Sequence, residues 1–114
     1  MKKPVFVSEQ DAAAMIGDGK TVATIGMTLV SASETILKAI EKRFLETGSP
    51  NQLTLVHSCG QSDRDRGIQH FSHDGMLKCI IGGHWGLQPR MMKMIAENKM
   101  LAYCLPQGQF AQLY

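Results

Sequence analysis

Long apolar runs and a surplus of charge of one sign are both missing from these 114 residues. No stretch approaches the roughly 20 apolar residues that a membrane-spanning helix needs, and the apolar run near the start is far shorter than a signal-peptide core. Twelve Lys and Arg stand against ten Asp and Glu, and the net charge of +2 offers nucleic acid little attraction. We therefore expect a cytoplasmic protein with neither a membrane nor a nucleic-acid partner.

Cysteine is scarce, and the CxxC spacing of zinc and redox sites is absent. The three cysteines, Cys59, Cys79 and Cys104, are odd in number and far apart, which fits a reducing compartment. Cys79 and Cys104 lie in strand-like apolar runs, where we expect small buried side chains. The phosphate-binding patterns GxGxxG and GxxxxGK[ST] are also absent, so a dinucleotide or nucleoside triphosphate site is unsupported.

What the sequence does contain is a regular alternation of strand and helix patterns. Short β-branched and apolar runs predict strands at 21–25, 53–57, 77–81 and 101–105. Apolar residues at helical spacing and capping signals predict helices from Ser8, over 34–47, from Gln88 and from Gln109, with a short helical turn at 68–71. This order implies βαβ units, so we expect an α/β fold with a mostly parallel sheet flanked by helices.

Glycine is concentrated where the predicted strands end. In open α/β sheets, ligands bind beyond the carboxyl ends of the strands. Glycine there permits close backbone approach, and a free backbone N–H could hold an anion or a thioester oxygen. The alternative is that these glycines only form tight turns, and the residues alone leave both interpretations open. The four strand ends are Gly26–Thr28, His57–Gly60, Gly82–Gly86 and Leu105–Gly108.

Two further interpretations rest on histidine and cysteine. His57 and Cys59 share a face of a strand, so an imidazole and a thiol could pair for nucleophilic catalysis, although no acid is placed to orient them. A structural cysteine is the favoured interpretation. Together with His70, His73 and His84 they could also supply metal ligands, but no structural zinc spacing is present, and we expect no metal.

Several stretches, taken together, resemble family I coenzyme A transferases over nearly the whole chain. The most similar type is the long single-chain acyl-CoA:acetate/3-ketoacid CoA-transferase, a short-chain acetate CoA-transferase. The resemblance is most specific at Gly82–Leu87 and Ile95–Lys99. The other matching stretches are Asp18–Gly26, Ser33–Leu37, Ile40–Gly48, Leu105–Gly108 and Gln112–Tyr114.

The resemblance implies a CoA-transferase-like layer sandwich, with residues 1–114 as the N-terminal part of its first domain and no second domain in this chain. It also implies transfer of CoA between a short-chain acyl-CoA, of the acetyl or acetoacetyl type, and a free carboxylate such as acetate. In this family a glutamate followed by Asn-Gly carries CoA as a glutamyl thioester. Glu97 precedes Asn98, but Lys99 replaces the glycine, and the other glutamates lack this context.

The resemblance therefore implies that the nucleophile lies in the remainder of the same polypeptide and that these residues alone are inactive. Coenzyme A is then a substrate, not a cofactor, and the full-length protein is expected to be a homo-oligomer. The natural chain should continue past residue 114, with a Glu-Asn-Gly element.

Site residues follow from the same resemblance. Gln107, in Pro106-Gln107-Gly108, matches the family glutamine that lines the acyl site, where an amide N–H can donate to a substrate oxygen. Gly26 and Met27 stand where the family has a Gly-Gly-Phe-type turn, of which only Gly26 is retained. Cys59 stands where many relatives have asparagine. The further pocket candidates are Cys59, Gly83 and His84.

Two other hypotheses remain open at the level of the sequence. The chain could be a non-catalytic α/β module for small-molecule binding or interaction, which CoA binding without turnover would favour. It could also be a fragment whose exposed sheet edge and apolar helix faces need missing partners, which poor solubility would favour.

Overall fold

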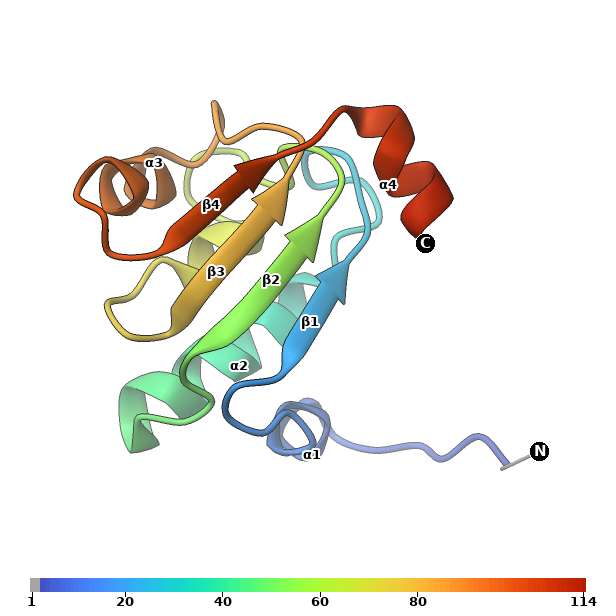
Figure 1. Ribbon diagram of the computed structural model, residues 1–114. Helices are drawn as coiled ribbons and strands as arrows, with labels where there is room; N and C mark the ends of the chain where they lie inside the picture. The colour runs from blue at the N-terminus through green and yellow to red at the C-terminus, as the bar shows by residue number, and fades with distance from the viewer. Residues whose placement is uncertain (1–2) are drawn as a thin grey trace.

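A computed structural model describes residues 3–114 and shows one four-stranded parallel sheet with helices packed on it (Figure 1). The strands lie side by side in chain order, and every pairing is parallel. The α/β fold with a parallel sheet is therefore confirmed, and each strand lies within one residue of its predicted bounds. The strands are β1 (Thr21–Thr24), β2 (Leu53–His57), β3 (Leu77–Gly82) and β4 (Leu101–Cys104).

The helices begin and end at local signals in the sequence. Ser8 caps α1 (Glu9–Ala14), since its Oγ accepts a 3.1 Å hydrogen bond from the Asp11 N–H. Gly48 ends α2 (Glu34–Thr47) in the left-handed conformation. Pro89 is the first residue of α3 (Pro89–Ala96), where its missing N–H costs nothing. A 3₁₀ helix, η1 (Gly67–Phe71), forms the predicted short turn.

The last helix differs from its prediction. It is α4 (Gln107–Leu113), and it begins two residues before the predicted start at Gln109. Pro106, with its φ fixed at −57°, stands at the N-cap and leads the chain directly into the helix. Gln107 is therefore the first residue of α4 rather than part of a strand-breaking loop.

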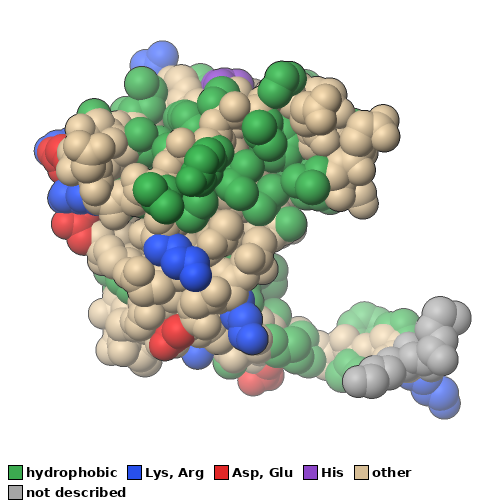
Figure 2. Space-filling model, in the orientation of Figure 1, with side chains coloured by type: hydrophobic (Ala, Val, Ile, Leu, Met, Phe, Trp, Pro, Cys, Tyr) green, Lys and Arg blue, Asp and Glu red, His purple; other side chains and the backbone are tan. Residues whose placement is uncertain are grey.

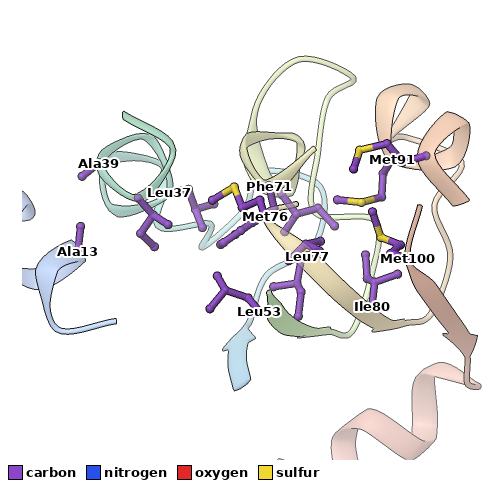
Figure 3. Packing of buried hydrophobic residues seen from close by; sticks show 14 residues of the cluster. Ala13, Leu37, Ala39, Leu53, Phe71, Met76, Leu77, Ile80, Met91 and Met100 are labelled. Carbon is purple, nitrogen blue, oxygen red and sulfur yellow. The ribbon is translucent and has the colours of Figure 1, made fainter. Parts of the chain in front are cut away.

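Strand register divides the sheet into two faces. Val22, Leu55, Ile80 and Ala102 lie in one row across the four strands and pack into the core beneath α2, η1 and α3. Figure 3 shows this core closing around Phe71, Met76 and Leu77. Met91 and Met94 of α3 are buried in it, whereas Met92 faces outward.

The opposite face carries apolar side chains with little helical cover. Its rows are Thr21–Thr54–Cys79–Leu101 and Ala23–Val56–Ile81–Tyr103. Leu101 and Tyr103 are 61% and 54% exposed. Figures 1 and 2 show this face toward the viewer, with hydrophobic side chains gathered over it and α2 behind the sheet.

The predicted burial of the strand cysteines is wrong for Cys104, which is exposed, and holds only in part for Cys79. β4 is an edge strand with one neighbour, so nothing packs over Cys104, and its thiol donates to the Gly83 carbonyl oxygen at 3.2 Å.

Residues 1–2, which include one of the lysines at the start of the apolar run, lie outside the described residues. Within residues 3–114, every helix is too short or too polar to cross a membrane.

Candidate functional site

The carboxyl ends of the four strands meet along one edge of the sheet. The last row of the register joins Thr24, His57, Gly82 and Cys104. The segments that follow these four residues contain all the predicted site residues. Parallel pairing therefore brings together residues that are up to 80 positions apart in the chain, as the fold rule for open sheets requires.

His57 is fully buried at this edge and is held at both ring nitrogens. Its Nδ1–H donates to the Cys59 carbonyl oxygen at 2.8 Å, and its Nε2 accepts the Trp85 indole N–H at 3.0 Å. Burial lowers the pKa of His57 to about 4, against the opposing effect of the Cys59 hydrogen bond. His57 is therefore neutral near pH 7, and it contacts Cys59 through the backbone rather than through the thiol.

Gln107 packs directly on the glycine that follows β3. A Cβ atom on Gly83 would lie 2.5 Å from the Gln107 Nε2 and 2.2 Å from the Ser58 carbonyl oxygen. Only glycine leaves room for both neighbours at this position. The structure therefore brings two of the predicted residues, Gly83 and Gln107, into contact.

His84 joins the loops that follow β2 and β3. Its Nε2 accepts the Gly60 N–H at 3.2 Å, and a Cβ on Gly60 would lie 2.5 Å from the imidazole ring. The Gly86 N–H also points at the His84 Nδ1, at 3.3 Å, so backbone N–H groups approach the ring at both nitrogens. His84 is exposed, and these contacts hold it between the loops after β2 and β3.

Gly26 and Met27 form a narrow turn after β1. The Met27 N–H donates to the Val30 carbonyl oxygen at 3.1 Å, and the Val30 N–H donates back at 2.9 Å. A Cβ on Gly26 would lie 2.8 Å from that same Val30 oxygen, so the turn requires glycine. The Met27 N–H is thus occupied, while its side chain is 61% exposed.

The helix α4 links the two ends of this edge. It begins at Gln107 beside β4, and the Tyr114 hydroxyl after its last turn donates to the Thr24 carbonyl oxygen of β1 at 3.0 Å. Figure 1 shows α4 on the β1 side of the strand ends. Gln107 and the Gly26–Met27 turn therefore belong to one continuous edge.

The strand-end segments carry no Lys, Arg, Asp or Glu over Gly26–Thr28, His57–Gly60, Gly82–Gly86 and Leu105–Gly108. The functional groups there are amides, imidazoles, thiols and backbone N–H groups, which suit an uncharged carbonyl or thioester. Nothing at this edge would neutralise phosphate groups. Among residues 3–114, no group of three or more His, Cys, Asp and Glu side chains is arranged to hold a metal ion.

The structure also contains a cluster of ionisable groups that the sequence reasoning missed. Glu34 and Glu41 of α2 meet His70 and His73 through hydrogen bonds of 2.5–2.7 Å. The signal was present in the sequence, because Glu34 and Glu41 are seven residues apart on one helix face and the two histidines are three apart.

Comparison with known proteins gives a consistent result. No protein-family model matches the chain. The acetate CoA-transferase YdiF of Escherichia coli K12 is 32% identical over 108 residues, which are 93% of this chain and 20% of the relative. The caffeate CoA-transferase of Acetobacterium woodii is 34% identical over 110 residues, 96% of this chain and 21% of the relative. The chain thus spans about a fifth of the length of these curated relatives.

Solved structures agree with the sequence comparison. The YdiF acyl-CoA transferase from E. coli O157:H7, as a thioester complex with CoA, has a TM-score of 0.84 and 33% identity over 93% of this chain and 22% of that one. The apoenzyme has a TM-score of 0.86 and 31% identity over 98% of this chain and 23% of that one. By sequence and by fold, the chain is similar to a segment that makes up about a fifth of the length of these CoA-transferases.

Proposed function

We propose that the full-length protein is a CoA-transferase that moves coenzyme A between a short-chain acyl-CoA and a free carboxylate such as acetate. The donor is of the acetyl-CoA or acetoacetyl-CoA type, and CoA passes through a glutamyl thioester. The residues of this chain form one wall of the acyl pocket. The relatives named as acetate and caffeate CoA-transferases support the reaction class.

The observation that carries the pocket assignment is the contact between Gln107 and Gly83. This contact lies at the edge where the four strands end, and the glutamine is exposed there. An exposed amide can donate an N–H to a thioester or carboxylate oxygen. Gln107 is therefore the binding residue, with Gly83 setting its position.

The neighbouring groups suit an uncharged acyl group. Buried, neutral His57 keeps the loop after β2 in place without adding a charge beside the reacting carbonyl. The exposed Met27 side chain, next to Gly26, supplies apolar surface on the β1 side. The remaining pocket candidates, Cys59 and His84, lie on the two loops between these positions.

The nucleophile is assigned to the rest of the polypeptide. The glutamates of α2 are engaged by histidine and lysine, and Glu97 binds Lys99 at 3.2 Å. Since the strand-end segments hold no basic residue, the phosphates of CoA would also meet groups from outside this chain. In this proposal CoA is a substrate, and no cofactor is required.

The test is Gln107→Ala in the full-length protein. Loss of one donor to the reacting carbonyl costs about 1–3 kcal/mol, so kcat/KM for CoA exchange should fall roughly tenfold or more. Gln112→Ala is the matched control, because this second glutamine of α4 is also exposed but lies away from Gly83. Equal activity of the Gln107→Ala and Gln112→Ala proteins would remove Gln107 from the acyl site.

A further inference from the structure

The cluster of Glu34, Glu41, His70 and His73 lies between α2 and the segment that contains η1. His70 Nδ1 is 2.5 Å from Glu41 Oε2, and His70 Nε2 is 2.7 Å from Glu34 Oε1. His73 Nε2 is 2.6 Å from the second oxygen of Glu41. The His70 side chain is only 9% exposed, so these bonds are largely shielded from water.

Proton counting fixes the state of His70. An ionised carboxylate only accepts hydrogen bonds, and a neutral imidazole has a single N–H to donate. With a carboxylate oxygen at each ring nitrogen, His70 satisfies both contacts only as the imidazolium. Loss of its proton necessarily breaks one of the two bonds that tie η1 to α2.

The lowered pKa values of Glu34 and Glu41 fit a positively charged His70 between them. Burial raises the pKa of Glu41, but hydrogen bonds from His73 and His70 outweigh burial and hold that pKa below its usual value. The pKa of Glu34 is lowered in the same way, with burial opposed by His70 and by the Gly67 N–H. Both carboxylates are thus ionised at neutral pH.

A continuous set of hydrogen bonds leads from this cluster to the strand-end edge. Glu34 Oε2 accepts the Gly67 N–H at 2.9 Å, and the adjacent Ile68 N–H donates to the Gln61 carbonyl oxygen at 2.9 Å. The buried Gln61 side chain then donates to the Thr24 carbonyl oxygen at 2.8 Å. Thr24 is the last residue of β1 and precedes the Gly26–Met27 turn.

We infer that this cluster positions the loop after β2 and the end of β1 for the acyl site, and that it does so only while His70 carries its second proton. His70 is a positioning residue, since it acts through Glu34, Gly67 and Gln61 rather than on substrate. Its effect on CoA transfer rests on the proposed function. Its effect on the loop does not.

Three cations lie around the cluster, and none of them replaces the hydrogen bonds that His70 makes to the two glutamates. On α2, Lys38 Nζ is 3.9 Å from Glu34, with an exposed side chain. On the loop, Arg66 is paired to Asp63 at 2.6 Å and lies near enough to Glu34 for their charges to interact. On α3, Arg90 donates to the Gln69 carbonyl oxygen. These cations support ionised glutamates, and none replaces the two N–H groups of His70.

The test compares His70→Gln with the wild type in the full-length protein by amide hydrogen exchange. Glutamine has a single donor nitrogen, and its carbonyl oxygen can only accept, so it does not present an N–H on each side as the imidazolium does. We expect exchange at Gly67 and Ile68 to become about tenfold faster, with β2 and β3 unchanged. Glu46→Gln is the matched control, because Glu46 is an exposed glutamate on the same helix that pairs only with Lys42. It should leave these amides unchanged.

The pH dependence separates positioning from a merely structural role. In the wild type, protection of Gly67 and Ile68, corrected for intrinsic exchange, should fall once His70 has lost its second proton, because a neutral ring donates to only one of the two carboxylates. In His70→Gln it should be low and flat. Identical protection and pH profiles in the two proteins would overturn the inference. If His70→Gln does not fold, Glu41→Gln gives a second comparison: its amide can donate to Nδ1 of a neutral His70, so protection of Gly67 and Ile68 should no longer depend on the second proton of His70.

Activity measurements distinguish this inference from the proposed function. If the wild type exchanges CoA, kcat of His70→Gln should fall several-fold, whereas kcat of Glu46→Gln should not change. If the wild type does not exchange CoA, the proposed function fails, and the hydrogen-exchange comparison still decides whether His70 holds the loop.

Discussion

At the scale of single residues, burial decides what each histidine can do. His57 accepts one hydrogen bond and donates one, and its pKa is lowered to about 4, so it is a neutral support for the loop after β2. His70 faces two carboxylates and requires the opposite charge state. The sequence shows four histidines without this distinction, because the distinction arises from partners 2 to 36 residues away.

The lowered pKa of His57 predicts a specific loss of stability in acid. Its unfolded-state pKa of about 6.5 lies above the folded value of about 4, so the unfolded chain binds the extra proton first. The contribution is fully present above pH 6.5 and is lost as pH falls toward 4. Between pH 7.5 and pH 5 the wild type should lose about 2 kcal/mol more unfolding free energy than His57→Gln.

Urea unfolding of both proteins at the two pH values measures this difference. Because the comparison is between wild type and variant, the titration of Glu34, Glu41 and the other histidines cancels. Parallel pH dependence of the two unfolding free energies would mean that His57 is not held neutral by burial.

Gly67 and Gly75 allow a second test at this scale. Both have positive φ, +73° and +83°, but a Cβ on Gly67 would lie 1.9 Å from the Gln61 carbonyl oxygen, whereas one on Gly75 meets nothing within 4 Å. Gly75→Ala should cost about 1–2 kcal/mol from the backbone conformation alone. Gly67→Ala should cost about 2–5 kcal/mol, since a clash is added. Equal losses in thermal unfolding would contradict the close approach of Gly67 to Gln61.

At the scale of secondary structure, the elements were largely predictable, and their contacts were not. Local signals such as Ser8, Gly48 and Pro89 act within a few residues, so they fixed helix ends correctly. The exposure of Cys104 could not be predicted from its apolar neighbours in the sequence, because it depends on β4 being an edge strand. The contact of Gln107 with Gly83 likewise depends on strand order.

Arg43 illustrates a contact between elements that no local pattern reveals. From α2 it donates to the Ala13 and Ile16 carbonyl oxygens at 3.0 and 2.6 Å, just where α1 ends. The last turn of α1 carries no basic side chain of its own. Arg43 therefore supplies a donor to the Ile16 carbonyl and a second donor to the Ala13 carbonyl, which also accepts the Ile16 N–H, and it fastens α1 to α2.

Arg43→Met should accordingly destabilise the protein by about 1–2 kcal/mol and speed amide exchange within α1. Lys42→Met is the control, because Lys42 is 68% exposed and makes only a 3.9 Å pair with Glu46, so its loss should stay within about 0.5 kcal/mol. Chemical unfolding and hydrogen exchange measure both effects. If the two variants were equally stable, α1 would not depend on Arg43.

At the scale of the whole molecule, the sheet is unusual in having one open face. Parallel sheets are nearly always covered on both faces, yet here the rows ending in Leu101 and Tyr103 have little cover (Figures 1 and 2). The sequence predicted the strands but not which face stays open, because both faces carry apolar residues. The relatives are about five times longer than this chain.

The open face predicts self-association of the 114-residue chain. Leu101→Thr with Tyr103→Thr removes apolar surface and introduces β-branched residues, which favour strands, so the dimeric and larger species should decrease with little change in stability. Met15→Gln, an exposed apolar residue beside α1, should leave association unchanged. Sedimentation velocity checks this, and equal association of both proteins would place the contact elsewhere.

The proposed CoA-transferase reaction requires the full-length protein to form a covalent CoA intermediate. Incubation with acetyl-CoA, followed by intact-mass analysis and peptide mapping, measures this directly. We predict a CoA-sized mass increase on a glutamate outside residues 1–114, removed by added acetate with formation of acetyl-CoA. Absence of both the adduct and acetate-dependent exchange, or an adduct on a residue within 1–114, would contradict the account.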